Sequence, residues 1–236
     1  MTKRRSKKPS GTIGSIIMRS ADQKAEFQPI SFPKDKAERE QFIVKFFTQV
    51  LRRSGKYPDE LIGDPIQNLE SDYDFTLKTV SGTEYLELME VAPLEGVGGS
   101  YQKAPGSYNH GELADFIYEK LIAKSTKYHA RALPPIHLLL YTTDFRFVVT
   151  KNVLFLVGYL CQQTKHSFKT IIYFVPYDAT HGEAKKLYPL PSKAFKDFDV
   201  QATRHRISML GDPTKINVKP DGSVEIPLMS PKKRFK

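Results

Sequence analysis

Two acidic residues, Asp74 and Glu87, lie on neighbouring segments that alternate between apolar and polar residues. The segments, 73–80 and 84–92, are joined through a Ser-Gly pair typical of a tight turn, which predicts a β-hairpin. With residues 81–82 as a two-residue turn, the hairpin places both acids on one face as diagonal neighbours. Their Cβ atoms would then lie about 7 to 8 Å apart.

Two carboxylates at this separation repel each other unless a positive group lies between them. A divalent cation about 2.1 Å from an oxygen of each carboxylate could bridge them, and a lysine is the alternative. The face that carries the acids is expected to be polar. Glu90 falls on the opposite, apolar face, so it is not expected to be a ligand. That apolar face is expected to contribute a core set from both strands: Tyr73, Phe75, Leu77, Leu86 and Leu88.

The segments on either side of the hairpin predict helices. Asp35 and Glu38 form a capping pattern in front of apolar residues at helical spacing, and this helix is expected to end at Gly55. Asn109 and Glu112 begin a second helix in the same way. Both helices have one apolar side, so both are expected to pack on a core.

The rest of the chain completes an α/β pattern. Residues 136–141 and 168–175 are short apolar runs typical of buried strands, and residues 150–163 are apolar nearly all round, as in a central helix. This order of elements predicts a mixed central β-sheet with helices on both faces. A Pro-Asp-Gly turn between residues 215–219 and 223–228 predicts a small C-terminal hairpin appendage.

The arrangement resembles the PD-(D/E)XK nuclease superfamily, in which a hairpin carries an Asp on its first strand and Glu-x-Lys on its second. Asp74, in Ser-Asp-Tyr-Asp-Phe, stands where the family has its first acid, and Glu87, in Tyr-Leu-Glu-Leu-Met, stands where it has the second. The resemblance covers about residues 35 to 177. It implies a restriction-endonuclease-like core of the αβββαβ type.

The resemblance also implies metal-assisted hydrolysis of phosphodiester bonds in DNA. Asp74, Glu87 and the backbone carbonyl of Leu88 would hold Mg²⁺ or Mn²⁺, which polarises the scissile phosphate and activates water. A lysine would stabilise the negative charge that develops on the phosphate. Met89 stands in place of the family lysine and cannot carry that charge. Three other lysines are candidates for the role: Lys78 on the hairpin, and Lys120 and Lys124 on the second helix.

The formal net charge of +10 lies almost entirely in the two tails. Five basic residues stand among the first ten and four among the last five, so residues 11–231 carry a formal charge of only +1. A body so close to neutral does not predict recognition of a nucleic-acid groove by a positive surface. The tails can contact phosphates of any sequence, and nucleic acid, DNA in particular, is the predicted partner.

A single cysteine, Cys161, excludes an internal disulfide and a zinc site built from several cysteines, which favours a reducing, cytoplasmic compartment. The longest apolar run, residues 153–161, is less than half of the roughly 20 residues that a membrane-spanning helix needs. We therefore expect a soluble protein without a membrane partner. It should have three parts: a flexible basic arm over residues 1–33, a nuclease-like core over residues 34–178, and a C-terminal extension with a hairpin and a basic tail over residues 179–236.

Two functions remain open from the sequence. The first is a metal-dependent nuclease acting on DNA, which the pairing of Asp74 with Glu87 favours. The second is a catalytically inactive protein of the same fold that binds nucleic acid or a protein partner, which Met89 favours. A second copy of the chain is a further candidate partner, because a polar hairpin face could meet another subunit.

Overall fold

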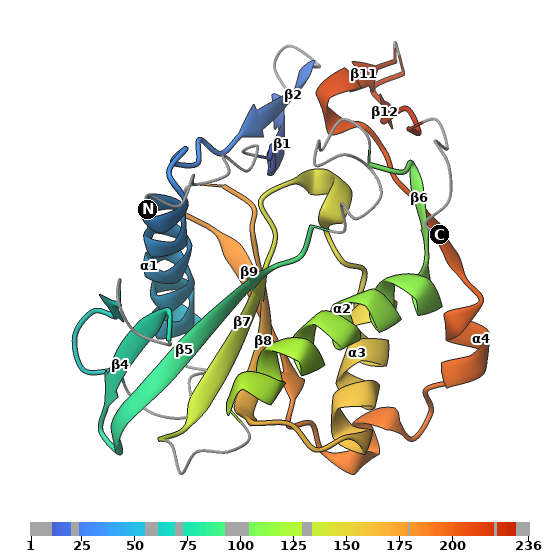
Figure 1. The fold of residues 1–236 in the computed structure, drawn as a ribbon. Helices are drawn as coiled ribbons and strands as arrows, with labels where there is room; N and C mark the ends of the chain where they lie inside the picture. Colours follow the sequence, from blue (N-terminus) through green and yellow to red (C-terminus); the bar gives the residue numbers. More distant parts are fainter. Residues whose placement is uncertain are drawn as a thin grey trace, which may run out of the picture.

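A six-stranded mixed β-sheet forms the centre of the computed structural model. The strands are β3 (Ile66–Gln67), β4 (Phe75–Thr79), β5 (Gly82–Glu90), β7 (Ile136–Tyr141), β8 (Phe168–Pro176) and β9 (Gly182–Tyr188). They lie side by side in that order (Figure 1). β5, β7 and β8 run parallel, whereas the other neighbouring pairs are antiparallel. The structure describes residues 11–19, 24–54, 61–68, 73–92, 104–128, 134–178, 180–219 and 221–229.

Helices cover both faces of this sheet, which confirms the predicted mixed α/β class. They are α1 (Lys36–Ser54), α2 (His110–Ser125), α3 (Lys151–Gln163) and the short α4 (Val200–Arg204). On one face α1 packs in a cluster that includes Phe47 and Phe174. On the other face α2 and α3 pack in a larger cluster that includes Ile117 and Leu138. Asp35 and Asn109 accept hydrogen bonds from the first-turn N–H groups of α1 and α2, as their capping patterns predict.

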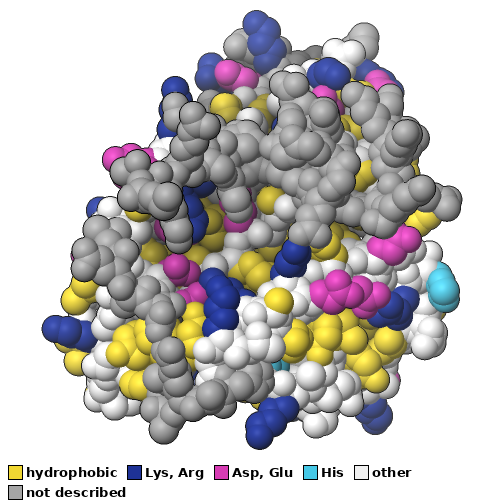
Figure 2. Space-filling view, in the orientation of Figure 1, with side chains coloured by type: hydrophobic (Ala, Val, Ile, Leu, Met, Phe, Trp, Pro, Cys, Tyr) yellow, Lys and Arg dark blue, Asp and Glu magenta, His cyan; other side chains and the backbone are white. Residues whose placement is uncertain are grey.

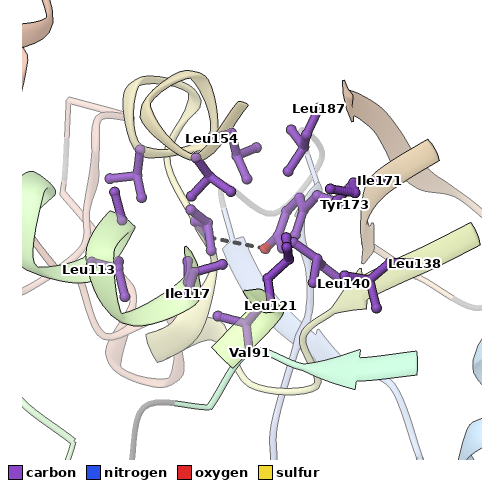
Figure 3. Packing of buried hydrophobic residues seen from close by; sticks show 14 of the residues in the cluster. Val91, Leu113, Ile117, Leu121, Leu138, Leu140, Leu154, Ile171, Tyr173 and Leu187 are labelled. Atoms are coloured by element: carbon purple, nitrogen blue, oxygen red, sulfur yellow. Dashed lines mark hydrogen bonds between the residues drawn. The ribbon is translucent and has the colours of Figure 1, made fainter. Parts of the chain in front are cut away.

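The cluster under α2 fixes where this helix crosses the sheet. Figure 3 shows Leu113, Ile117 and Leu121 of α2 directed at side chains of the central strands. The buried Tyr173 hydroxyl of β8 accepts a hydrogen bond from the Val149 N–H at 3.0 Å, so this phenol is satisfied inside the core. Because α2 is held along its length, the position of its last turn relative to β5 is set by core packing.

The β4–β5 hairpin forms as predicted, but its turn lies one residue earlier. Thr79 pairs with Gly82, so residues 80–81 are the turn in place of residues 81–82. Gly82 has a φ of +127°, a conformation that suits glycine, and it begins β5. The pairing thereby shifts by two residues. A shift of two leaves every strand side chain on its predicted face.

Shorter elements surround the central sheet. The strands are β1 (Gly14–Arg19), β2 (Lys24–Pro29), β6 (Ser107–Asn109), β10 (Ile207–Met209), β11 (Asn217–Val218) and β12 (Val224–Glu225). The 3₁₀ turns are η2 (Thr126–Tyr128), η3 (Phe145–Phe147), η4 (Ser192–Phe195) and η5 (Pro213–Lys215). β11 and β12 pair antiparallel, as the predicted C-terminal hairpin requires. β9 adds a strand to the central sheet from beyond residue 178, where we expected the core to end.

Residues 14–19 and 24–29, which the sequence assigned to a flexible arm, form the antiparallel pair β1–β2. This pair is attached to the end of β7: the Thr12 N–H donates to Oδ2 of the fully buried Asp144 at 2.9 Å, and the Phe145 N–H donates to the Thr12 carbonyl at 2.8 Å. Each of these strands has only six residues and contains polar residues, so the sequence shows no sustained alternation that would predict them. The basic residues of both tails lie outside the described residues. Within the described part of the chain, none of the helices has the length and apolar character to span a bilayer.

Candidate functional site

Asp74 and Glu87 face each other where β4 begins. Phe75 begins β4 and pairs with Leu86. Continuing this register by one residue places the two acids directly opposite each other, closer than the diagonal relationship expected from the sequence. Oδ2 of Asp74 accepts a hydrogen bond from the Leu88 N–H at 2.7 Å. Because the N–H and C=O of one residue in such a ladder point toward the same neighbour, the Leu88 carbonyl also points to the Asp74 side of β5.

The hairpin face that carries the acids is mostly covered, which corrects the expectation of a polar face. Tyr85 and Met89 on this face pack against the α2 and α3 cluster. The Glu87 side chain between them is only 3% exposed. The alternation of the sequence identified the face correctly, but it could not show that α2 crosses over it. Asp72, which the alternation of the hairpin also places on this face, lies outside the described residues.

Burial of the Glu87 carboxyl is the main reason that its pKa lies above the usual value, and the Asp74 carboxylate raises this pKa further. Lys124 and Tyr128 act in the other direction, because both donate hydrogen bonds to Glu87 and so favour its charged form. The site is therefore a partly desolvated acid pair with donors directed at one of its members.

Lys124 supplies the positive charge that the acid pair requires. Its Nζ lies 2.5 Å from Oε2 of Glu87 and 3.7 Å from Oδ2 of Asp74. The Lys124 side chain is 20% exposed and extends from the last turn of α2. Of the two ways to relieve the repulsion that the sequence left open, a cation or a lysine, this structure contains the lysine.

The other two candidate lysines have different surroundings. Lys120, one turn earlier in α2, is exposed, and its Nζ lies 5.5 Å from the ring centroid of Phe116. Lys78 is exposed on β4 and pairs in the ladder with Thr83, near the turn end of the hairpin. Lys120 and Lys124 are four residues apart and therefore lie on the same side of α2. Lys124, in the last turn of the helix, is the one that pairs with Glu87.

Sequence reasoning missed Tyr128, which follows α2 in η2 and is 5% exposed. Its hydroxyl is hydrogen-bonded to Glu87, and burial together with this carboxylate raises the pKa of the phenol. The Tyr128 ring stacks on Tyr73, with centroids 5.4 Å apart. Tyr73 was predicted to share the core face of Phe75. It lies in the cluster of α2 and α3 instead, because it precedes β4 and does not follow the alternation of that strand.

A third acid, Glu40 of α1, was also missed. Its carboxylate pairs with the Lys36 ammonium at 3.3 Å, and burial raises its pKa, with a smaller contribution from the charge of Asp74. The signal was present in the sequence. Glu40 is three residues before Ile43 and seven before Phe47, so helical spacing places it on the buried face of α1.

The residues of this site fit a divalent cation. Oε1 of Glu87 is buried and has no hydrogen-bond partner among the residues that the structure describes. A buried carboxylate oxygen without a donor, opposite a second carboxylate and beside the Leu88 carbonyl, matches the all-oxygen surroundings that Mg²⁺ and Mn²⁺ prefer. Two carboxylate side chains meet at this site, and the described segments contain no group of three or more His, Cys, Asp and Glu side chains suited to hold an ion, so a third protein ligand would be the Leu88 carbonyl.

Figure 2 shows acidic and basic side chains side by side in the region over β5, next to apolar surface. Comparison of the chain with protein-family models, with curated proteins and with solved structures gave no match.

Proposed function

We propose that this protein is a metal-dependent nuclease that hydrolyses phosphodiester bonds in DNA. The observation that supports this most directly is the meeting of the Asp74 and Glu87 carboxylates with the Lys124 ammonium at the start of β4. Phosphodiester hydrolysis of this kind needs oxygen ligands for a hard cation and a fixed positive charge near the phosphate. The element order gives further support: once β6, which pairs with β10 outside the central sheet, is left aside, α1, β3, β4, β5, α2 and β7 follow the αβββαβ order that the proposal expects.

Each residue of the site has a role in this proposal. Asp74, Glu87 and the Leu88 carbonyl would hold Mg²⁺ or Mn²⁺, which when bound polarises the scissile phosphate and lowers the pKa of water. Lys124 stabilises the negative charge that develops on the phosphate oxygens. It thus takes the role of the family lysine, whose position is occupied by Met89 in this chain. Lys120, exposed one turn away, is assigned to a neighbouring phosphate of the same strand.

A second candidate is a catalytically inactive protein of the same fold that binds nucleic acid or a protein partner. One observation favours it: the Lys124 ammonium already lies within ion-pair distance of both acids. An acid pair neutralised in this way is a stable arrangement without any cation.

Cleavage assays decide between the two candidates. Single-stranded, double-stranded and branched DNA would be incubated with the wild type over a titration of Mg²⁺ or Mn²⁺, in parallel with Asp74→Asn and Glu87→Gln. Glu90→Gln is the matched control, since Glu90 lies on the same strand but faces the α1 side and accepts a hydrogen bond from Thr143 at 2.6 Å. We expect metal-dependent cleavage that either site substitution abolishes and the control retains. Metal-independent cleavage, or cleavage by the site variants, contradicts the proposal, and DNA binding without cleavage supports the second candidate.

A further inference from the structure

Tyr128 and Lys124 both donate hydrogen bonds to Glu87, but only the lysine is charged. From this contact and the packing of the ring we infer that Tyr128 is a positioning residue: it holds the Glu87 carboxylate in the orientation that binds a divalent cation. The inference rests on the proposed function, because it assigns a role at the same site.

The surroundings of Tyr128 leave its ring little freedom. One face of the ring lies against Tyr73 at an interplanar angle of 20°. Phe168 of β8 approaches with its ring at 66° and a centroid distance of 6.4 Å. With the ring held on two sides and 5% exposed, the hydroxyl has a fixed place relative to Glu87.

The stack also connects Tyr128 with the backbone that carries both acids. Tyr73 lies parallel to Tyr85, with an interplanar angle of 5° and centroids 4.1 Å apart. Tyr73 directly precedes Asp74, and Tyr85 is two residues before Glu87 on the same strand face. Three stacked tyrosines therefore form a rigid support under the two carboxylates.

The two carboxylate oxygens of Glu87 differ in their hydrogen-bond partners. Oε2 is bonded to the Lys124 ammonium at 2.5 Å, whereas Oε1 is the buried oxygen without a donor in the described residues. A carboxylate fixed in this way has lost its rotational freedom before an ion arrives. Outer hydrogen-bond partners of this type typically change metal affinity by about 10-fold to 100-fold.

The test measures Mn²⁺ binding in the absence of nucleic acid. Isothermal titration calorimetry would be performed on the full chain as wild type, Tyr128→Phe, Glu87→Gln and Tyr118→Phe. Tyr118 is the matched control because it lies on α2, and the substitution makes the same chemical change away from the site. We expect Tyr128→Phe to weaken Mn²⁺ binding about tenfold or more at an unchanged Tm, and Tyr118→Phe to bind as the wild type does.

If Tyr128→Phe binds Mn²⁺ as tightly as the wild type, the inference is overturned and the proposed function is not. If wild type and Glu87→Gln give the same titration, the site holds no cation and both fail. If Tyr128→Phe lowers the Tm, p-aminophenylalanine at position 128 decides the matter, since it keeps the ring and places an N–H donor where the hydroxyl was. Restored affinity then supports positioning through the hydrogen bond, and affinity as low as that of Tyr128→Phe contradicts it.

Discussion

The Lys124 ammonium lies 2.5 Å from Oε2 of Glu87 and so stands in the space that a cation bridging Glu87 and Asp74 would approach. A lysine and a divalent ion that use the same carboxylates must compete for them. Lys124→Met is therefore expected to bind Mn²⁺ more tightly than the wild type, because the competing charge is gone. The same substitution should lower DNA cleavage by about 100-fold or more, since the phosphate loses its stabilising charge.

Calorimetry with Mn²⁺ and a cleavage time course on the same preparations would measure both effects. Lys127→Met, an exposed lysine three residues farther along the chain, is the control for a general loss of positive charge. Weaker Mn²⁺ binding by Lys124→Met would contradict competition, and undiminished cleavage would contradict the role given to Lys124.

A pH-dependent contribution to stability follows from Glu87, whose pKa in the folded protein is raised by burial and by Asp74. A folded-state pKa above the unfolded one means that folding favours the neutral carboxyl over the charged one, compared with the unfolded chain. The stability associated with this group is present below the unfolded pKa of about 4.3 and is lost as the pH rises through the folded pKa. Glu87→Gln, which is neutral at every pH, should therefore gain stability relative to the wild type at pH 8 compared with pH 4.5.

Urea denaturation at the two pH values would test this expectation, with the exposed Glu119→Gln on α2 as control. A difference between Glu87→Gln and the wild type that stays constant, or that moves in the opposite direction, would show that burial does not dominate at Glu87.

The hairpin faces could be predicted because strand alternation survives a turn misplaced by one residue. The pairing moved by two residues when Gly82 entered β5, and an even shift keeps Asp74 and Glu87 on one face. The helix boundaries could be predicted because the caps, Asp35 and Asn109, are local. The strands at residues 14–19 and 24–29 were missed because short alternating segments carry little periodic signal.

The contacts of the site depended on long-range packing and could not be predicted from local pattern. The approach of Lys124 to Glu87 depends on how α2 crosses β5, which the core cluster decides. Tyr128 lies beyond the end of α2, where helical periodicity no longer applies. Glu40 could have been found, because a carboxylate on the apolar side of a predicted helix is itself a signal.

The basic tails give a prediction about salt. Replacing the five basic residues in the first ten by glutamine should reduce the salt dependence of DNA binding, because each phosphate contact contributes about 0.9 to the slope of log K against log salt for duplex DNA. Cleavage at saturating DNA should change little, since the site lies in the body. Fluorescence anisotropy at several salt concentrations measures the slope. An unchanged slope would show that the N-terminal tail does not contact phosphates.

Glu84 and His137 form a buried pair near the start of β5 and β7, and the two residues are 2% and 1% exposed. Oε2 of Glu84 lies 2.9 Å from Nε2 of His137. The other ring nitrogen of His137 is hydrogen-bonded to Thr170, and the Lys169 ammonium lies 2.6 Å from Oε1 of Glu84. Glu84→Ala leaves His137 buried without its carboxylate. A buried group left without its hydrogen-bond partner costs about 1 to 3 kcal/mol, so the free energy of unfolding should fall by about that amount.

Lys169→Ala is the matched comparison at the same carboxylate. The Lys169 side chain is 43% exposed, so its pairing with Glu84 is screened by solvent and its loss should cost about 1 kcal/mol or less. Urea denaturation of both variants measures the two costs. Equal losses would mean that the solvent-screened lysine, and not the buried histidine, determines the contribution of Glu84. A Glu84→Ala variant as stable as the wild type would show that the buried pair is replaceable by apolar packing.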